Sequence, residues 1–151
     1  MAQTNRSGFT LIELIVVVAI LGTLATLVMI RFTGAQSSAR DTRRQSDVRQ
    51  YQNALEVYAN RSNSLYPVYA SAINVTTSSF CNTELKLTNC PDDPQGANPY
   101  KYQSNASGTE YVVWTRLEKP NTAGNTEYYI VCSNGSVGRK ETAPSSATCP
   151  L

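Results

Sequence analysis

Glu13 is the only charged residue between Phe9 and Ile30, in a run that is otherwise dominated by apolar side chains. About 20 apolar residues suffice for a helix to cross a bilayer, so this run predicts a transmembrane helix. A carboxylate in such a run is costly unless it is paired or reaches water, which makes Glu13 a candidate functional residue. The alternative is a carboxylate near a helix N-terminus that gains from the helix dipole and reaches the lipid headgroups.

The cysteines are the other residues with chemistry of their own, and all of them follow the apolar run. They are Cys81, Cys90, Cys132 and Cys149. An even number in an exported region predicts two disulfides, and four cysteines allow three connectivities. We expect the pairs Cys81–Cys90 and Cys132–Cys149, because each closes a short loop. Zinc is the alternative, but no C-x2-C spacing occurs.

Catalytic and metal-binding residue sets are sparse. The chain has no histidine, which excludes a Ser-His-Asp triad and any histidine-ligated metal. No paired carboxylates share one predicted element and no glycine-rich phosphate loop occurs, so we expect no enzyme activity. Asp92 and Asp93 are weak candidates for calcium, although adjacent aspartates beside prolines more often form turns. We therefore expect no cofactor, and the net charge of +2 is no strong argument for nucleic acid.

A single long helix is expected to position the N-terminal residues. No proline interrupts the chain from Phe9 to Arg61, so one helix can cover this range. After Arg31, apolar residues recur at helical spacing and predict a stripe that faces a core. The stripe consists of Ala35, Ala39, Val48, Tyr51, Leu55 and Tyr58. The charged residues of segment 40–49 are expected on the solvated faces of the helix.

The remaining sequence predicts a small antiparallel sheet. Short alternating segments are bounded by turn residues, and they predict strands at 99–102, 110–117, 127–133 and 136–140. Asn134-Gly135 is the preferred two-residue hairpin turn, and segment 71–79 is expected to be an irregular loop. The fold class is therefore α+β, with a long N-terminal helix packed on a small antiparallel β-meander.

The N-terminal residues form the most specific motif. A short polar leader ends at Gly8, Phe9 follows, and Glu13 is the fifth residue counted from Phe9. This pattern resembles the type IV pilin and pseudopilin family. The resemblance implies a pilin-like fold, and it implies that a prepilin peptidase cuts between Gly8 and Phe9 and methylates the new amine. It also implies that Glu13 acts in assembly. An ordinary signal anchor is the alternative.

Together these observations divide the chain into four parts. Residues 1–8 are a cleaved leader, 9–30 a transmembrane and filament-core helix, 31–62 the amphipathic half of the helix, and 63–151 a globular β domain with two disulfides. The resemblance and the cysteines place the globular part outside the cytoplasm. Counting arginines gives the opposite orientation, because Arg6 precedes the apolar run whereas five follow it. These five are Arg31, Arg40, Arg43, Arg44 and Arg49.

The resemblance predicts a structural subunit of a type IV pilus-like surface filament, inserted in the inner membrane, processed by prepilin peptidase and used for motility, adhesion or DNA uptake. The implied partners are copies of itself, other pilins, the peptidase, the membrane and an assembly platform, while nucleic acid stays open. One alternative is a type II secretion pseudopilin of a periplasmic pseudopilus. Another is a minor pilin that binds a ligand or DNA.

One segment is similar to a particular branch of the family. Residues 93–102 look like the Asp-Pro-x-Gly-x-Pro-Tyr-x-Tyr segment of the major pseudopilin of type II secretion. That relative binds calcium in an aspartate-rich loop before its last strands. The matching segment here, 118–126, contains no aspartate, and this departure favours the pilus subunit.

Overall fold

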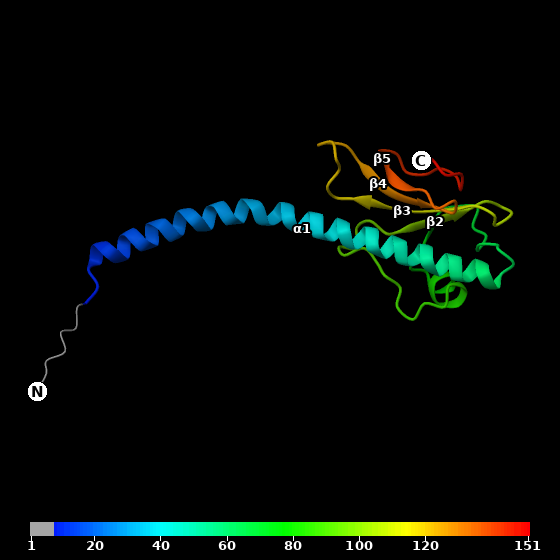
Figure 1. Cartoon of the computed structure of the whole chain (residues 1–151), viewed down its shortest axis with the longest axis horizontal. Helices are drawn as coiled ribbons and strands as arrows, with labels where there is room; N and C mark the ends of the chain where they lie inside the picture. Colours follow the sequence, from blue (N-terminus) through cyan, green and yellow to red (C-terminus); the bar gives the residue numbers. More distant parts are fainter. Residues whose placement is uncertain (1–7) are drawn as a thin grey trace, which may run out of the picture. The chain divides into compact units, whose positions relative to one another are not determined.

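The computed structural model describes residues 8–151, with side chains at 8–26 and 34–151 (Figure 1). The leader before Gly8 lies outside these residues. The chain divides into two compact units, Met1–Gln36 and Ser37–Leu151. One long helix, α1, runs from Leu11 to Arg61 and contributes to both units, as the absence of proline predicts.

The first unit is helical from Leu11 onward, and the large apolar side chains that the structure describes there are exposed. Phe9 is 91% exposed, and the apolar side chains that follow as far as Leu24 are also solvent-accessible. Within the described residues, no helix combines the length and the hydropathy that a membrane crossing requires. The predicted spanning segment, 9–30, includes residues 27–30, whose side chains lie outside the described part.

The helix ends where the sequence predicts. Asn63 and Ser64 adopt positive φ values, and the N–H of Ser64 donates to the carbonyl of Ala59 at 2.9 Å. Helices commonly end with a residue in the left-handed conformation, whose N–H donates to a carbonyl of the last helical turn. Pro67 then keeps Tyr66 out of the helical region of backbone conformation, so the helix cannot resume there.

The second unit contains a five-stranded antiparallel sheet in the order β1-β2-β3-β4-β5. The strands are β1 (Ile73–Asn74), β2 (Lys101–Ser104), β3 (Tyr111–Leu117), β4 (Glu127–Cys132) and β5 (Val137–Lys140). The predicted α+β class and the four later strands are confirmed. The expectation of an irregular loop at 71–79 is wrong, because Ile73–Asn74 pairs with β2 and a short π-helical turn, η1, covers Ser79–Glu84.

The turn between β4 and β5 is longer than the predicted two-residue turn. The N–H of Gly135 donates to the carbonyl of Cys132, and the N–H of Cys132 donates to the carbonyl of Ser136, both at 3.0 Å. The connection therefore contains Ser133 as well as Asn134 and Gly135. Gly135 has a φ of 83°, which suits the three-residue hairpin loop whose last residue is left-handed.

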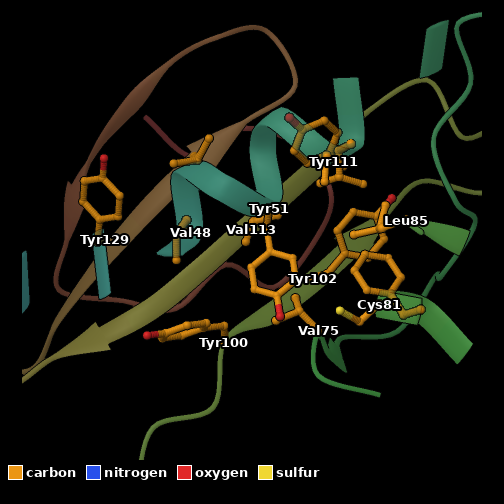
Figure 2. Close-up of a cluster of buried hydrophobic side chains, with 14 of the residues drawn as sticks. Val48, Tyr51, Val75, Cys81, Leu85, Tyr100, Tyr102, Tyr111, Val113 and Tyr129 are labelled. Atoms are coloured by element: carbon orange, nitrogen blue, oxygen red, sulfur yellow. The ribbon is translucent and has the colours of Figure 1, made fainter. Parts of the chain in front are cut away.

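One face of the sheet packs on α1 and forms the main core. Figure 2 shows Val48 and Tyr51 of the helix against Val113 and Tyr102 of the sheet. The predicted alternation holds along β3, since Tyr111, Val113 and Leu117 face this core while Val112 and Trp114 face the other side. The buried tyrosine hydroxyls have hydrogen-bond partners, as when Tyr111 donates to Glu56 at 3.0 Å.

The buried stripe of α1 differs from the predicted one at its start. Ala35 and Ala39 are exposed, whereas Asp41 and Arg44 are buried. The expectation that the charged segment 40–49 lies only on solvated faces is therefore wrong. The helical period does continue through these positions, but here the buried residues of the helix are charged and paired.

The second face of the sheet carries a smaller cluster. It consists of Val112, Trp114, Ile130 and Cys132, with Cys149 of the C-terminal tail packed against it. The disulfides are Cys81–Cys90 and Cys132–Cys149, the pairs expected from the loop lengths, with Cα separations of 6.0 and 5.6 Å. Each stabilises the unit by roughly 2–4 kcal/mol, and the second fastens the tail to β4.

Candidate functional site

Glu13 and Thr10 form a reciprocal cap at the beginning of α1. The carboxylate of Glu13 accepts from the backbone N–H of Thr10 at 2.9 Å and from its hydroxyl at 2.7 Å. In return, the N–H of Glu13 donates to the hydroxyl oxygen of Thr10 at 3.3 Å. This is the capping box, in which the residue before the helix and the third helical residue satisfy each other's free N–H groups.

The cap leaves part of the carboxylate available. Both contacts with Thr10 use Oε2 of Glu13, and among the described residues no donor contacts Oε1. The cap therefore fixes the direction of the side chain, while one oxygen and the negative charge can meet a cation from outside the chain. The two roles considered for Glu13 are therefore compatible. The same carboxylate can stabilise the helix start and offer an assembly contact.

The predicted processing site lies just before the helix. Gly8, Phe9 and Thr10 are exposed and not helical, so the bond between Gly8 and Phe9 is accessible. A Cβ added at Gly8 would meet nothing within 4 Å. The described fold therefore does not itself require glycine there, and any such requirement must come from outside the chain.

A buried arginine, Arg44, organises the second unit where α1 meets two loops. Its side chain is fully buried, its Nε donates to Asp93 at 2.5 Å, and its NH1 contacts Asp41 at 2.8 Å. NH1 also forms an ion pair with Glu118. Arg40 holds the same carboxylate of Glu118 from the previous helical turn, with Nε at 2.9 Å from Oε1.

The two loops are attached to this cluster through their backbones as well. Asp93 accepts from the N–H groups of Ala97 and Asn98 at 2.9 and 3.1 Å, which closes the turn of segment 93–98. Asp41 accepts from the N–H groups of Glu118 and Lys119 at 2.9 and 2.8 Å. The arginine thus connects the helix to both loops, and the carboxylates shape the loops themselves.

The ion pairs shift the pKa values of the carboxyls. Burial by itself raises the pKa of Asp93, but the hydrogen bonds from Arg44 and from the amides of Asn98 and Ala97 outweigh it and hold that pKa below its ordinary value. Hydrogen bonding from Arg40 is the main reason that the pKa of Glu118 is lowered, with Arg44 adding to it against a smaller opposing effect of burial.

Acid is expected to weaken the second unit through these two carboxyls. A carboxyl whose pKa is lower in the folded state contributes stability above its unfolded pKa, and this contribution is lost as the pH falls through the folded pKa. We therefore expect the free energy of unfolding to be level from about pH 7 to about pH 5 and to fall below about pH 4. Urea unfolding followed by tryptophan fluorescence measures it, and a level free energy down to about pH 3 would contradict the prediction.

The two aspartates considered for calcium already have partners within the chain. One oxygen of Asp93 is occupied by the guanidinium of Arg44 and the other by backbone N–H groups, while Asp92 accepts from the N–H of Asp93 at 2.7 Å. Calcium needs six to eight oxygen ligands. In the part of the chain that the structure describes, no group of three or more His, Cys, Asp or Glu residues could hold a metal ion.

Comparisons with known proteins bear on the choice between the family alternatives. Residues 3–29 match the family described as Prokaryotic N-terminal methylation motif. The chain is 30% identical over 146 residues to the type II secretion system core protein G of Pseudomonas aeruginosa, which covers 91% of this chain and 91% of that protein. The chain belongs to the type II secretion system core protein G family.

Two further relatives agree. The core protein G of Vibrio cholerae is 33% identical over 107 residues, which is 66% of this chain and 72% of that protein. The core protein G of Aeromonas hydrophila is 33% identical over 112 residues, which is 69% of this chain and 77% of that protein. No solved structure matches the chain at a significant level.

The family assignment confirms the predicted resemblance and corrects its main interpretation. The family is one of pilin-like structural subunits, and the relatives favour the secretion pseudopilin over the surface pilus. The lack of aspartate in segment 118–126 was a misleading signal. In this chain the segment is attached by Glu118 to Arg40 and Arg44, so it needs no aspartate of its own to be held.

Sequence reasoning singled out Glu13 but missed its cap, and it missed the buried cluster. The spacing Thr10-x-x-Glu13 is the capping-box signature, so the cap could have been predicted. For the cluster, Asp41, Arg44 and Val48 share the spacing of the buried stripe, and a continued helical period was the available signal. Nothing in the sequence indicates that Asp93 lies opposite Arg44, because that contact depends on the fold.

Proposed function

We propose that this chain is a structural subunit of the periplasmic pseudopilus of a type II secretion system. The alignment with the core protein G of Pseudomonas aeruginosa over 91% of both chains carries the proposal. The exposed apolar side chains at the start of α1 support it, because so many apolar groups require a partner. The membrane is that partner before assembly, and the same helices of neighbouring subunits replace it in the filament.

The proposed life cycle follows from the same parts. The precursor is a single-pass protein of the inner membrane with its globular unit outside the cytoplasm, where the two disulfides can form. Prepilin peptidase removes the leader before assembly. An assembly platform then adds the subunit to a filament of identical copies and other pilins.

Deletion of the coding sequence tests this function against the surface-pilus alternative. In the source bacterium, the loss is expected to leave exported proteins in the periplasm while sheared surface filaments stay at wild-type amounts. Re-expression of the chain should restore the extracellular proteins. Loss of sheared filaments with normal secretion would contradict the pseudopilus and favour the surface pilus.

Replacing Gly8 with valine is expected to leave the leader uncut. The side chain has free space in this structure, so the fold is unaffected and the change acts on the peptidase. Mass spectrometry of the purified subunit should find a precursor with residues 1–8 attached and no methylated Phe9. Gly22→Val is the control, because a Cβ there also meets nothing within 4 Å. A processed Gly8→Val subunit that begins at Phe9 would contradict the prediction.

We propose that the subunit folds and assembles without calcium. Arg44 and Arg40 hold segment 118–126 through Glu118, so the loop has its attachment within the chain. A calcium chelator is expected to leave the urea midpoint and the yield of filament unchanged, with magnesium supplied to keep divalent ions present. A fall of the midpoint that added calcium restores would contradict this.

A further inference from the structure

A basic groove crosses the face of the sheet that does not pack on α1. Its volume is about 380 Å³, and its lining comes from β2, β3 and β4 together with two loops and the C-terminal tail. The lining residues are Ala72, Ala97, Asn98, Pro99, Lys101, Trp114, Arg116, Tyr128 and Ala143. The set contains two cations and no acid, and its walls are small or apolar side chains.

Strand register makes Lys101 and Arg116 neighbours of Trp114 on one face of the sheet. Lys101 pairs directly with Trp114, and Arg116 follows Trp114 by two positions on the same face of β3. Arg116 in turn pairs with Tyr128. Diagonal neighbours of this kind lie within reach of long side chains, so the ammonium and the guanidinium can contact one ligand group.

Neither cation has a partner within the described residues. Lys101 and Arg116 form no ion pair and no side-chain hydrogen bond there, in contrast to Arg40, Arg44 and Arg139, which all meet carboxylates. Arg116 is exposed and Lys101 is half-buried, so both charges are accessible to a molecule that enters the groove. An accessible pair of cations without a counter-charge is complementary to a carboxylate.

The walls of the groove are held in place by features already described. Asp93 fixes the turn that precedes Pro99, through its hydrogen bonds to Ala97 and Asn98. The Cys132–Cys149 disulfide fastens the tail that carries Ala143. The groove is therefore a preformed feature of the second unit, and binding there costs little ordering of the chain.

We propose that this groove binds an acidic polypeptide segment, with a carboxylate between Lys101 and Arg116 and an apolar side chain against Pro99 and Ala143. A nucleic acid fits less well, because single strands bind by stacking bases on open aromatic faces and Trp114 is only 5% exposed. The volume suits one or two side chains, at the lower end of ligand sites. This site goes beyond filament assembly and does not depend on it.

The single tryptophan of the chain makes the proposal directly measurable. Trp114 is part of the groove's lining, so its fluorescence reports on occupancy there. The full chain in a mild zwitterionic detergent is titrated with a short peptide of alternating glutamate and leucine, which has no aromatic residue of its own. We expect a saturable change that weakens as salt is added. The matched peptide with glutamine in place of glutamate should give no saturable change.

Two double variants test how much the two cations contribute to binding. The double variant Lys101→Gln, Arg116→Gln is expected to bind the acidic peptide about tenfold more weakly. Lys86→Gln, Lys119→Gln removes the same charge from exposed positions outside the groove and is expected to bind as the wild type does. Equal loss in both double variants, an equal response to the glutamine peptide, no saturable change at all, or tighter binding of oligodeoxythymidylate would each overturn the proposal.

Discussion

Replacing Arg44 with methionine is expected to lower the free energy of unfolding of the second unit by about 3–5 kcal/mol. Methionine preserves much of the side-chain volume, so the change mainly removes the charge and its hydrogen bonds. Asp93 would then keep a fully buried carboxylate without its cation, and Asp41 would lose its contact at 2.8 Å. Urea unfolding of the full chain, followed by the fluorescence of Trp114, measures the loss.

Arg43→Met is the matched control for this variant. Arg43 is the neighbouring residue, its side chain is 65% exposed, and its Nε lies 3.8 Å from Asp47. A long ion pair whose cation is exposed contributes about 0–1 kcal/mol, so the control should differ little from the wild type. If Arg44→Met destabilises no more than Arg43→Met, the buried cluster does not hold the loops.

A second variant keeps the first prediction testable if Arg44→Met fails to fold. Asp93→Asn retains the shape of the side chain and one carbonyl oxygen, but it removes the negative charge opposite Arg44. Since Arg44 keeps Asp41 and Glu118 as partners, we expect a smaller loss, together with a weaker dependence of stability on acid. If the stability of Asp93→Asn depended on acid as strongly as that of the wild type, Asp93 would not be among the carboxyls responsible for the acid dependence.

The parts of the fold that sequence predicted are those with strong local patterns. Alternation along β3 gives the strand and its two faces, because successive side chains point to opposite sides of a sheet. Glycine at 135 marks the hairpin, although the loop is one residue longer than the dipeptide alone suggests. The absence of proline sets the extent of α1, and the loop lengths favour the disulfide pairs that the structure shows.

The parts that sequence missed depend on contacts between distant residues. Ile73–Asn74 is too short to show an alternation of apolar and polar residues. It forms a strand because it pairs with the edge of β2. The burial of Arg44 depends on Asp93, which is 49 positions away in the chain. A charged helical segment is usually solvated, and only the fold shows that here the carboxylates of two loops cover it.

Glu13→Gln is expected to abolish filament assembly while leaving membrane insertion and leader cleavage normal. In the filament, the apolar helices of neighbours surround this position, and an unpaired buried charge there costs several kcal/mol. The amine of Phe9 on a neighbouring subunit, created by cleavage, is the positive group at a matching depth. Oε1 of Glu13, which contacts no donor among the described residues, is free to accept it.

The capping box makes this variant a test of charge alone. Glutamine serves as well as glutamate at the third helical position of a capping box, so Glu13→Gln keeps the cap on Thr10. Thr10→Ala does the reverse, because it removes the cap at a cost of about 0.5–2 kcal/mol and keeps the carboxylate. We therefore expect filaments from the threonine variant and none from the glutamine variant, measured as sheared, pelleted subunit when the chain is overexpressed. Wild-type amounts of filament from Glu13→Gln would show that the pairing does not align the subunits, and the cap would then be the whole role of Glu13.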